Sequence, residues 1–175
     1  MSRVLLADDS PHAQRMGERI LRDEGCEVVT VTDGATALLR LADVDPDLIL
    51  ADALLPERSG YEIARYVKSH PAHRHVRVVL TAGALEPIDE EQLRRSQADA
   101  VIQKPFEASV MLETLRPLLE AARIARQMYA ATPGANTLPE ADPERVRAAV
   151  TLAVDAAMPR LIDELTARVL EALKR

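Results

Sequence analysis

The chain contains the stretch Val4-Leu5-Leu6-Ala7-Asp8-Asp9, in which four apolar residues run directly into two acidic ones. A short, uninterrupted apolar run of this kind is typical of a strand that is buried on both faces. The next residues, Ser10 and Pro11, favour the start of a helix, because Ser caps helices and Pro is well tolerated at the first helical position. A buried strand followed at once by a helix indicates an α/β fold.

Similar strand–helix units follow along the chain to about residue 126. Further apolar runs predict strands at residues 28–31, 47–51, 76–80 and 100–102. The stretches between the strands predict helices. Two of these helices begin after Ser10 and Asp33, and three span residues 61–68, about 90–97 and about 107–126. Five such units in succession predict a doubly wound parallel sheet with helices on both faces. In sheets of this kind, ligands bind at the carboxyl ends of the strands.

The composition narrows the class of protein. The 175 residues suffice for one domain with a small appendage. Acidic residues outnumber basic ones by 28 to 22, and the excess lies in residues 1–119, which hold 20 acidic and 14 basic residues. Neither part has the basic surplus that nucleic-acid binding requires. No apolar stretch has the length of a signal-peptide core or a membrane span, so we expect a cytoplasmic protein that contacts neither membrane nor nucleic acid.

The C-terminal part of the chain has a different composition. We expect a domain over residues 1–126, a Pro- and Ala-rich linker over residues 127–143 and a helical tail over residues 144–175. Pro159 divides the tail into two short helices, because proline inside a helix removes a backbone hydrogen bond and clashes with the preceding turn. Each helix carries an apolar stripe that it cannot bury alone. The tail must therefore pack on the domain over residues 1–126, on a second copy of the chain or on a downstream protein partner, and the last two are the leading hypothesis.

Polar side chains follow the ends of four of the predicted strands. Because the carboxyl ends of parallel strands meet at one edge of the sheet, we expect these side chains to converge there. Three carboxylates packed together repel each other and need a cation among them, and Mg²⁺ prefers such oxygen ligands. A hydroxyl and an ammonium beside that ion suit a transferred phosphoryl group. The residues concerned are Asp8, Asp9, Asp52, Thr81 and Lys104.

These residues carry a specific resemblance. Asp8-Asp9, Asp52, Thr81-Ala82 and Lys104-Pro105-Phe106, with Pro56 and Gly60 at fixed distances beyond Asp52, resemble the receiver domain of two-component response regulators. The resemblance is to receivers of the chemotaxis-regulator type and covers residues 3 to about 122. It implies a flavodoxin-like sheet with the strand order 2-1-3-4-5.

The resemblance also implies roles in phosphoryl transfer. Asp52 would be the phosphoacceptor, which takes the phosphoryl group from a sensor histidine kinase, a phosphotransfer protein or a small phosphodonor. Thr81 would donate a hydrogen bond to one phosphoryl oxygen, and Lys104 would pair with another. Pro105 would follow a cis peptide bond that aims Lys104. Such a protein is not an enzyme beyond its own phosphorylation and autodephosphorylation.

A magnesium site is implied at the same place. Asp9 and Asp52 would bind Mg²⁺ directly, and the backbone carbonyl of Leu54 would be a further ligand. Asp8 would act through a water molecule or from just outside the direct ligands. Mg²⁺ is the one cofactor that the resemblance implies.

The sequence departs from the family pattern at two places. Val101 stands where the family usually has Tyr or Phe, so we expect that the Thr81 half of the conformational switch remains and that the aromatic half is altered or absent. Leu54 and Gly83 occupy the positions that tune attack by water on the phosphorylated aspartate. Because neither side chain is able to position water, slow autodephosphorylation is predicted.

Two other functions remain open. The first is a scaffold that acts without phosphorylation, through oligomerisation by its tail. The presence of Asp52, Thr81 and Lys104 argues against it, whereas Val101 leaves it open. The second is a phosphatase-type enzyme on a similar fold. Such aspartate-dependent phosphatases need Asp-x-Asp after the first strand, which Ala7-Asp8-Asp9-Ser10 does not supply.

The histidines are the other candidate metal ligands. His70, His73 and His75 lie in a Pro-containing stretch without a Cys or carboxylate nearby in the sequence, and we interpret them as part of a solvated loop. His12 follows the acidic pair and is interpreted as a surface position on a helix.

Overall fold

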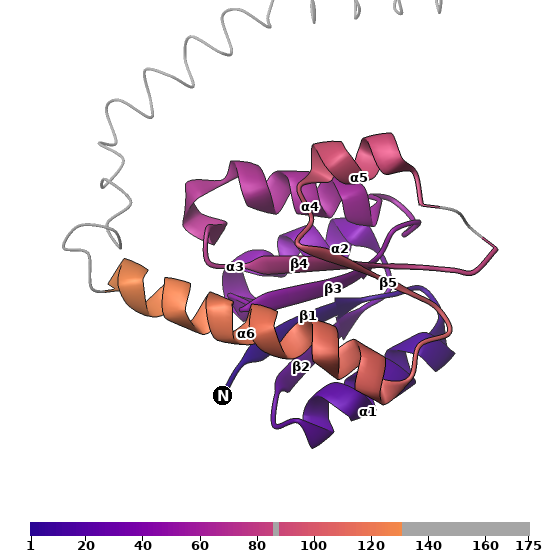
Figure 1. The fold of residues 1–175 in the computed structure, drawn as a ribbon. Helices are drawn as coiled ribbons and strands as arrows, with labels where there is room; N and C mark the ends of the chain where they lie inside the picture. Colours follow the sequence, from indigo (N-terminus) through magenta and orange to yellow (C-terminus); the bar gives the residue numbers. More distant parts are fainter. Residues whose placement is uncertain (86–87, 131–175) are drawn as a thin grey trace, which may run out of the picture. The chain divides into compact units, whose positions relative to one another are not determined.

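The computed structural model describes residues 1–85 and 88–130. Its strands form one five-stranded parallel sheet in the order β2-β1-β3-β4-β5 (Figure 1). The strands are β1 (Arg3–Ala7), β2 (Glu27–Val31), β3 (Leu48–Asp52), β4 (Arg77–Ala82) and β5 (Ala100–Gln103). This order confirms the predicted flavodoxin-like fold. The predicted tail, with its break at Pro159, and the linker beyond residue 130 lie outside the described residues.

The helices follow the strands along the chain. They are α1 (Pro11–Asp23), α2 (Gly34–Leu39), α3 (Leu41–Val44), α4 (Gly60–Ser69), α5 (Glu90–Ser96) and α6 (Ala108–Ala130), with a short 3₁₀ turn η1 (Pro71–His73). The side chains of Ser10 and Asp33 accept hydrogen bonds from the first turns of α1 and α2, as expected of helix caps. α6 continues to Ala130, past its expected end at Arg126. No helix among the described residues has the length and apolarity needed to cross a membrane.

Side chains that alternate along the strands build two cores, one on each face of the sheet. Leu5, Ile49 and Leu80 pack with residues of α2, α3 and α4 on one face. Leu6 and Leu50 point to the other face, where they pack with residues of α1 and α6. Successive strand residues point to opposite faces, so strands covered on both sides must be apolar throughout. This is the physical reason for the uninterrupted apolar runs in the sequence.

A close approach of α4 to β3 fixes the loop that follows Asp52. The backbone N–H of Gly60 donates to the carbonyl of Ala53 at 3.2 Å. A Cβ atom at position 60 would lie only 2.3 Å from the carbonyl oxygen of Asp52. Gly60 is therefore required by space, because any side chain there would push α4 away from the end of β3.

Replacing Gly60 by Ala is expected to lower the free energy of unfolding by about 1–3 kcal/mol, the usual cost of forcing extra atoms into a packed site. Urea denaturation measures the change. Gly17→Ala is the matched control, since a Cβ at this buried helical glycine meets only the flexible end of Leu6, at 3.2 Å. Similar stabilities for the two variants would show that β3 and α4 have room to separate.

Candidate functional site

Three carboxylates meet at the carboxyl edge of the sheet. Asp8 and Asp9 follow β1, and Asp52 is the last residue of β3. One carboxylate oxygen of each lies within 4.8 Å of the others. Asp8 and Asp52 are buried, whereas Asp9 is exposed. The structure thus brings together the three predicted aspartates in a cluster that could bind a metal ion.

Backbone groups orient the two buried carboxylates. Asp8 accepts a hydrogen bond through Oδ1 from the backbone N–H of Ser10 at 2.9 Å. Asp52 accepts one through Oδ1 from the backbone N–H of Leu54 at 2.8 Å. The amide of Gln14 on α1 donates to the carbonyls of Asp8 and Val31, at 2.5 and 3.1 Å, and holds the end of β1 in place. Each buried carboxylate therefore has one oxygen held by the backbone and keeps Oδ2 for other partners.

Lys104 supplies the cation that contacts both buried carboxylates. Its Nζ donates to Asp8 Oδ2 at 2.6 Å and to Asp52 Oδ2. Its backbone N–H donates to the carbonyl of Ala82 at 2.7 Å, and the peptide bond to Pro105 is cis, as the resemblance implied. Burial acts to lower the pKa of Lys104, but its hydrogen bonds to Asp52 and Asp8 and their negative charges outweigh burial and raise the pKa. Lys104 is therefore a positively charged ammonium at neutral pH.

The charges in the cluster do not balance. Three carboxylates face one ammonium, which leaves two negative charges at the carboxyl edge of the sheet. Like charges held this close favour the binding of a cation. Carboxylate oxygens are ligands that hard cations such as Mg²⁺ prefer. The donor set therefore fits a divalent metal ion.

Thr81 lies beside Asp52 on the neighbouring strand. The two residues are partners in the register of β3 and β4, and the carbonyl of Thr81 accepts from the backbone N–H of Ala53 at 2.8 Å. Thr81 is 2 % exposed, and its Oγ1 has no hydrogen-bond partner among the described residues. A buried hydroxyl without a partner is rare in folded proteins and costs about 1–3 kcal/mol. This hydroxyl is suited to donate to an acceptor oxygen brought by a ligand.

Val101 lies on the α4 and α5 side of the sheet. It pairs in register with Leu80 and is half-buried against that core. The same core contains Tyr61, a fully buried aromatic ring of α4 whose hydroxyl accepts from the backbone N–H of Asp89 at 3.1 Å. Tyr61 is not among the predicted site residues, although its place next to Gly60, in a chain with three Tyr, one Phe and no Trp, was an available signal. The expectation about the switch at Val101 stays a prediction.

The histidines only partly follow the interpretation as a solvated loop. His70 and His12 are exposed, but His75 is buried and its Nε2 lies 3.4 Å from Asp45 Oδ1. The interpretation was wrong for His75, because the fold brings Asp45 next to it from a distant part of the sequence. In residues 1–85 and 88–130, the only potential metal-binding cluster of His, Cys, Asp or Glu is the aspartate cluster.

Comparison with known proteins agrees with the fold. The family described as response regulator receiver domain matches residues 4–116. Protein PilG of Pseudomonas aeruginosa is 29% identical over 114 residues, which cover 65% of this chain and 84% of PilG. The polar-differentiation response regulator DivK of Brucella ovis is 29% identical over 116 residues, which cover 66% of this chain and 94% of DivK. The chain belongs to the response regulator receiver domain family, whose members are phosphoacceptors in two-component signal transduction.

Solved structures of receiver domains show the same fold. The chemotaxis response regulator CheY4 of Vibrio cholerae superposes with a TM-score of 0.62 at 27% identity, over 67% of this chain and 98% of CheY4. The receiver domain of a sensor histidine kinase from Pseudomonas aeruginosa PAO1, solved with a magnesium ion coordinated in its active site cleft, gives 0.62 at 26% identity. That match covers 68% of this chain and 98% of the other.

Replacing Thr81 by Val is expected to raise the free energy of unfolding by about 1 kcal/mol, because a buried hydroxyl without a partner is exchanged for a methyl group of the same shape. Thr36→Val is the control, and it should be destabilised, since the Thr36 hydroxyl donates to Asp33 Oδ2 at 2.7 Å. Urea denaturation of both variants makes the comparison. An equal loss in both would mean that the Thr81 hydroxyl is hydrogen-bonded in solution.

Proposed function

We propose that the chain accepts a phosphoryl group on Asp52 from a phosphohistidine of a sensor histidine kinase or phosphotransfer protein. The reaction depends on Mg²⁺, and the phosphorylated chain signals through protein–protein contacts rather than by binding DNA. The observation that carries this proposal is the arrangement of Lys104 and the Thr81 hydroxyl, which has no hydrogen-bond partner among residues 1–85 and 88–130, around the carboxylate of Asp52. An anchored nucleophile with a cation and a free hydroxyl beside it suits phosphoryl transfer.

The chemical step is a displacement at phosphorus. A carboxylate oxygen of Asp52 attacks the phosphorus atom, and the bond from phosphorus to the imidazole nitrogen of the donor breaks. The electron pair of that bond goes to the imidazole nitrogen, and an acyl phosphate forms on Asp52. The Lys104 ammonium and the Thr81 hydroxyl then stabilise the phosphoryl oxygens, where negative charge is concentrated.

Mg²⁺ fits the donor set at this edge. Asp9 and Asp52 would bind it directly, the carbonyl of Leu54 would add a backbone oxygen, and Asp8 would act through water. The metal supplies positive charge against the phosphoryl oxygens. The surplus of two negative charges supports this assignment, as does the related receiver domain that was solved with magnesium. Asp9 is exposed, so its carboxylate is open to an incoming ion.

A groove next to the site supports a protein as phosphodonor. It has a volume of about 510 Å³ and lies beside Lys104, with Met16 of α1, Leu85 and Phe106 in its lining. Leu85 is 95% exposed. An apolar groove beside a polar reaction centre suits a helix of a partner protein that carries a histidine at its edge. The acidic surplus of residues 1–119 argues against DNA as the partner.

Incubation with acetyl phosphate and Mg²⁺ is expected to add the mass of one phosphoryl group to the chain. Asp52→Asn should abolish this addition, because the amide is a poor nucleophile, and chelation of Mg²⁺ with EDTA should slow it strongly. Asp23→Asn, at an exposed aspartate on α1, is the control and should be phosphorylated like the unaltered chain. Intact-mass spectrometry gives the readout. No addition would support the scaffold, and repeated turnover of a phosphate ester would support a phosphatase.

Once phosphorylated, the chain is expected to lose its phosphoryl group slowly, over a time much longer than seconds. Leu54 follows Asp52 by two residues, and its side chain is apolar and exposed, so it does not orient a water molecule for attack. Leu54→Asn should shorten the half-life several-fold by supplying a polar group beside the acyl phosphate. Intact-mass measurements after removal of the phosphodonor follow the decay. A half-life of seconds for the unaltered chain would contradict this assignment of Leu54.

A further inference from the structure

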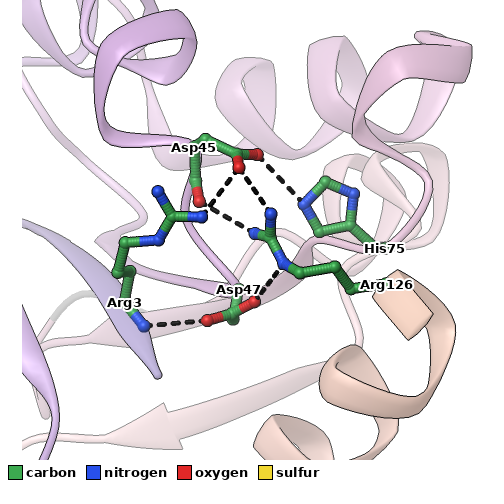
Figure 2. Close-up of polar contacts among 5 residues, drawn as sticks. All are labelled: Arg3, Asp45, Asp47, His75 and Arg126. Carbon is green, nitrogen blue, oxygen red and sulfur yellow. Dashed lines mark hydrogen bonds and ion pairs between the residues drawn. The ribbon is translucent and has the colours of Figure 1, made fainter. Parts of the chain in front are cut away.

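A second group of charged residues lies at the opposite edge of the sheet, at the amino ends of β1, β3 and β4 (Figure 2). Arg126 of α6 is its centre. Arg126 donates from Nη1 to Asp45 Oδ2 at 2.5 Å, from Nη2 to the carbonyl of Asp45 at 2.8 Å and from Nε to Asp47 Oδ1 at 2.7 Å. Arg3 of β1 donates to the same two aspartates, from Nη2 to Asp45 Oδ2 at 2.7 Å and from its backbone N–H to Asp47 Oδ2 at 2.8 Å.

The last turns of α6 depend on this group for their attachment. α6 contains Pro117, which lacks a backbone N–H and so interrupts the hydrogen bonding of the helix at that turn. Ala122 is the last fully buried apolar residue of the helix in the described part of the chain. Beyond it, Arg126 makes the contacts given above, and Tyr129 accepts from Arg74 at 3.4 Å. Beyond the last fully buried apolar residue, polar contacts therefore contribute to holding these turns in place.

His75 adds a titratable member to the group. It precedes β4, is 8 % exposed, and places Nε2 3.4 Å from Asp45 Oδ1 (Figure 2). This distance is that of an ion pair, and Nε2 makes no hydrogen bond within the described residues. With His75 neutral, two guanidinium groups and two carboxylates balance. Protonation of His75 adds a third positive charge and leaves the group with a net charge of +1.

We propose that Asp45, His75 and Arg126 form a pH-sensitive latch for the end of α6. With His75 neutral, Arg126 holds the last turns of α6 on the amino edge of the sheet. Protonated His75 competes for Asp45 and repels Arg126, which then detaches with the last turns of the helix. Arg126 is the member that leaves, because Arg3 is anchored by its own strand and by the bond of its backbone to Asp47.

The groups that face His75 agree with this direction. Burial lowers the pKa of His75, the charges of Arg126 and of His73 on η1 lower it further, and the charges of Asp45 and Asp47 only partly offset them. The folded state with its latch closed therefore disfavours the charged imidazole. The stability of the latch therefore decreases with falling pH. The latch is fully stable above the ordinary histidine pKa of 6.5, and it weakens as the pH falls through the lowered pKa of His75 in the folded protein.

The aspartate partner stays charged over the same range. Burial acts to raise the pKa of Asp45, but hydrogen bonds and charges from Arg126 and Arg3 outweigh burial and place the pKa below the ordinary 3.8. Burial lowers the pKa of Arg126, and its bonds to Asp45 and Asp47 raise it on balance. His75 is thus the member of the group that changes charge between neutral and mildly acidic pH.

The test is amide hydrogen exchange by NMR on the full chain at about pH 7.5 and about pH 5.0, corrected for the pH dependence of intrinsic exchange. Amides 124–129 of the unaltered chain should lose several-fold in protection at the lower pH, because protonation of His75 weakens the contacts of Arg126 and makes local opening easier. Amides of β3 should keep theirs. His75→Gln should keep protection at both pH values, and Arg126→Gln should lack it at both. Arg123→Gln is the matched control, since Arg123 is exposed on the same helix and pairs with Glu120.

A loss of protection at low pH in His75→Gln as large as in the unaltered chain would overturn the proposal, as would no loss in the unaltered chain.

A second measurement needs no variant. The NMR signals of the His75 ring and of the Arg126 Nε–H should titrate with the same midpoint in the unaltered chain. Different midpoints would separate the two residues and also overturn the latch. None of these readouts depends on phosphorylation of Asp52.

Discussion

The contact of the Lys104 ammonium with Asp8 and Asp52 is the interaction on which the carboxyl edge of this protein depends. It joins the ends of β1, β3 and β5, whose residues lie far apart in the sequence. Without a cation, two buried carboxylates this close would repel each other and push the strand ends apart. The hydrogen bonds from the backbone of Ser10 and Leu54 fix the outer oxygens, so the inner oxygens are left to face Lys104. A reaction centre is therefore held ready by the same bonds that hold the strand ends together.

The two edges of the sheet differ in charge balance, and that difference separates a site for a ligand from a structural contact. At the carboxyl edge, three aspartates face one lysine, and the Thr81 hydroxyl has no hydrogen-bond partner in the described part of the chain. At the amino edge, two arginines face two aspartates with most of their polar atoms paired. The surplus of negative charge and the Thr81 hydroxyl at the carboxyl edge favour the binding of a ligand from solution. The balanced charges at the amino edge favour the closed ion pairs, and these pairs open only when one member of the group changes charge.

Local patterns in the sequence predicted the alternating strands and helices and the meeting of polar residues at the carboxyl edge, whereas the strand order was implied by the family resemblance. Apolar runs define strands buried on two faces, and the topology of a parallel sheet brings the residues after Ala7, Ala51 and Leu80 to one edge. The amino edge could not be predicted in this way. Arg126 and Asp45 are 81 residues apart, and each alone is typical of a solvated surface position. Only the packing of α6 across the sheet makes them partners.

Other misses have the same physical origin. The predicted second helix is divided at Arg40 into α2 and α3, and α3 ends at Asp45 in a left-handed conformation with φ of 42°. That turn aims the Asp45 carboxylate at His75 and Arg126, and nothing in the local sequence requires it. The role of Tyr61 likewise depends on Asp89 in a later loop, whose backbone N–H donates to the Tyr61 hydroxyl. Side chains whose role depends on a distant partner are the ones that local patterns leave undetermined.

α6 connects the two edges, because it follows Lys104 and carries Arg126 near its other end (Figure 1). Two kinds of contact hold α6 along its length. The part up to Ala122 is held by burial of Met111, Leu115 and Ala122, which pH changes do not alter. The turns beyond Ala122 also depend on charged contacts of Arg126, which a single protonation can unbalance. The end of the helix is therefore the part of this receiver domain in which a small electrostatic change moves backbone without disturbing the reaction centre or the sheet.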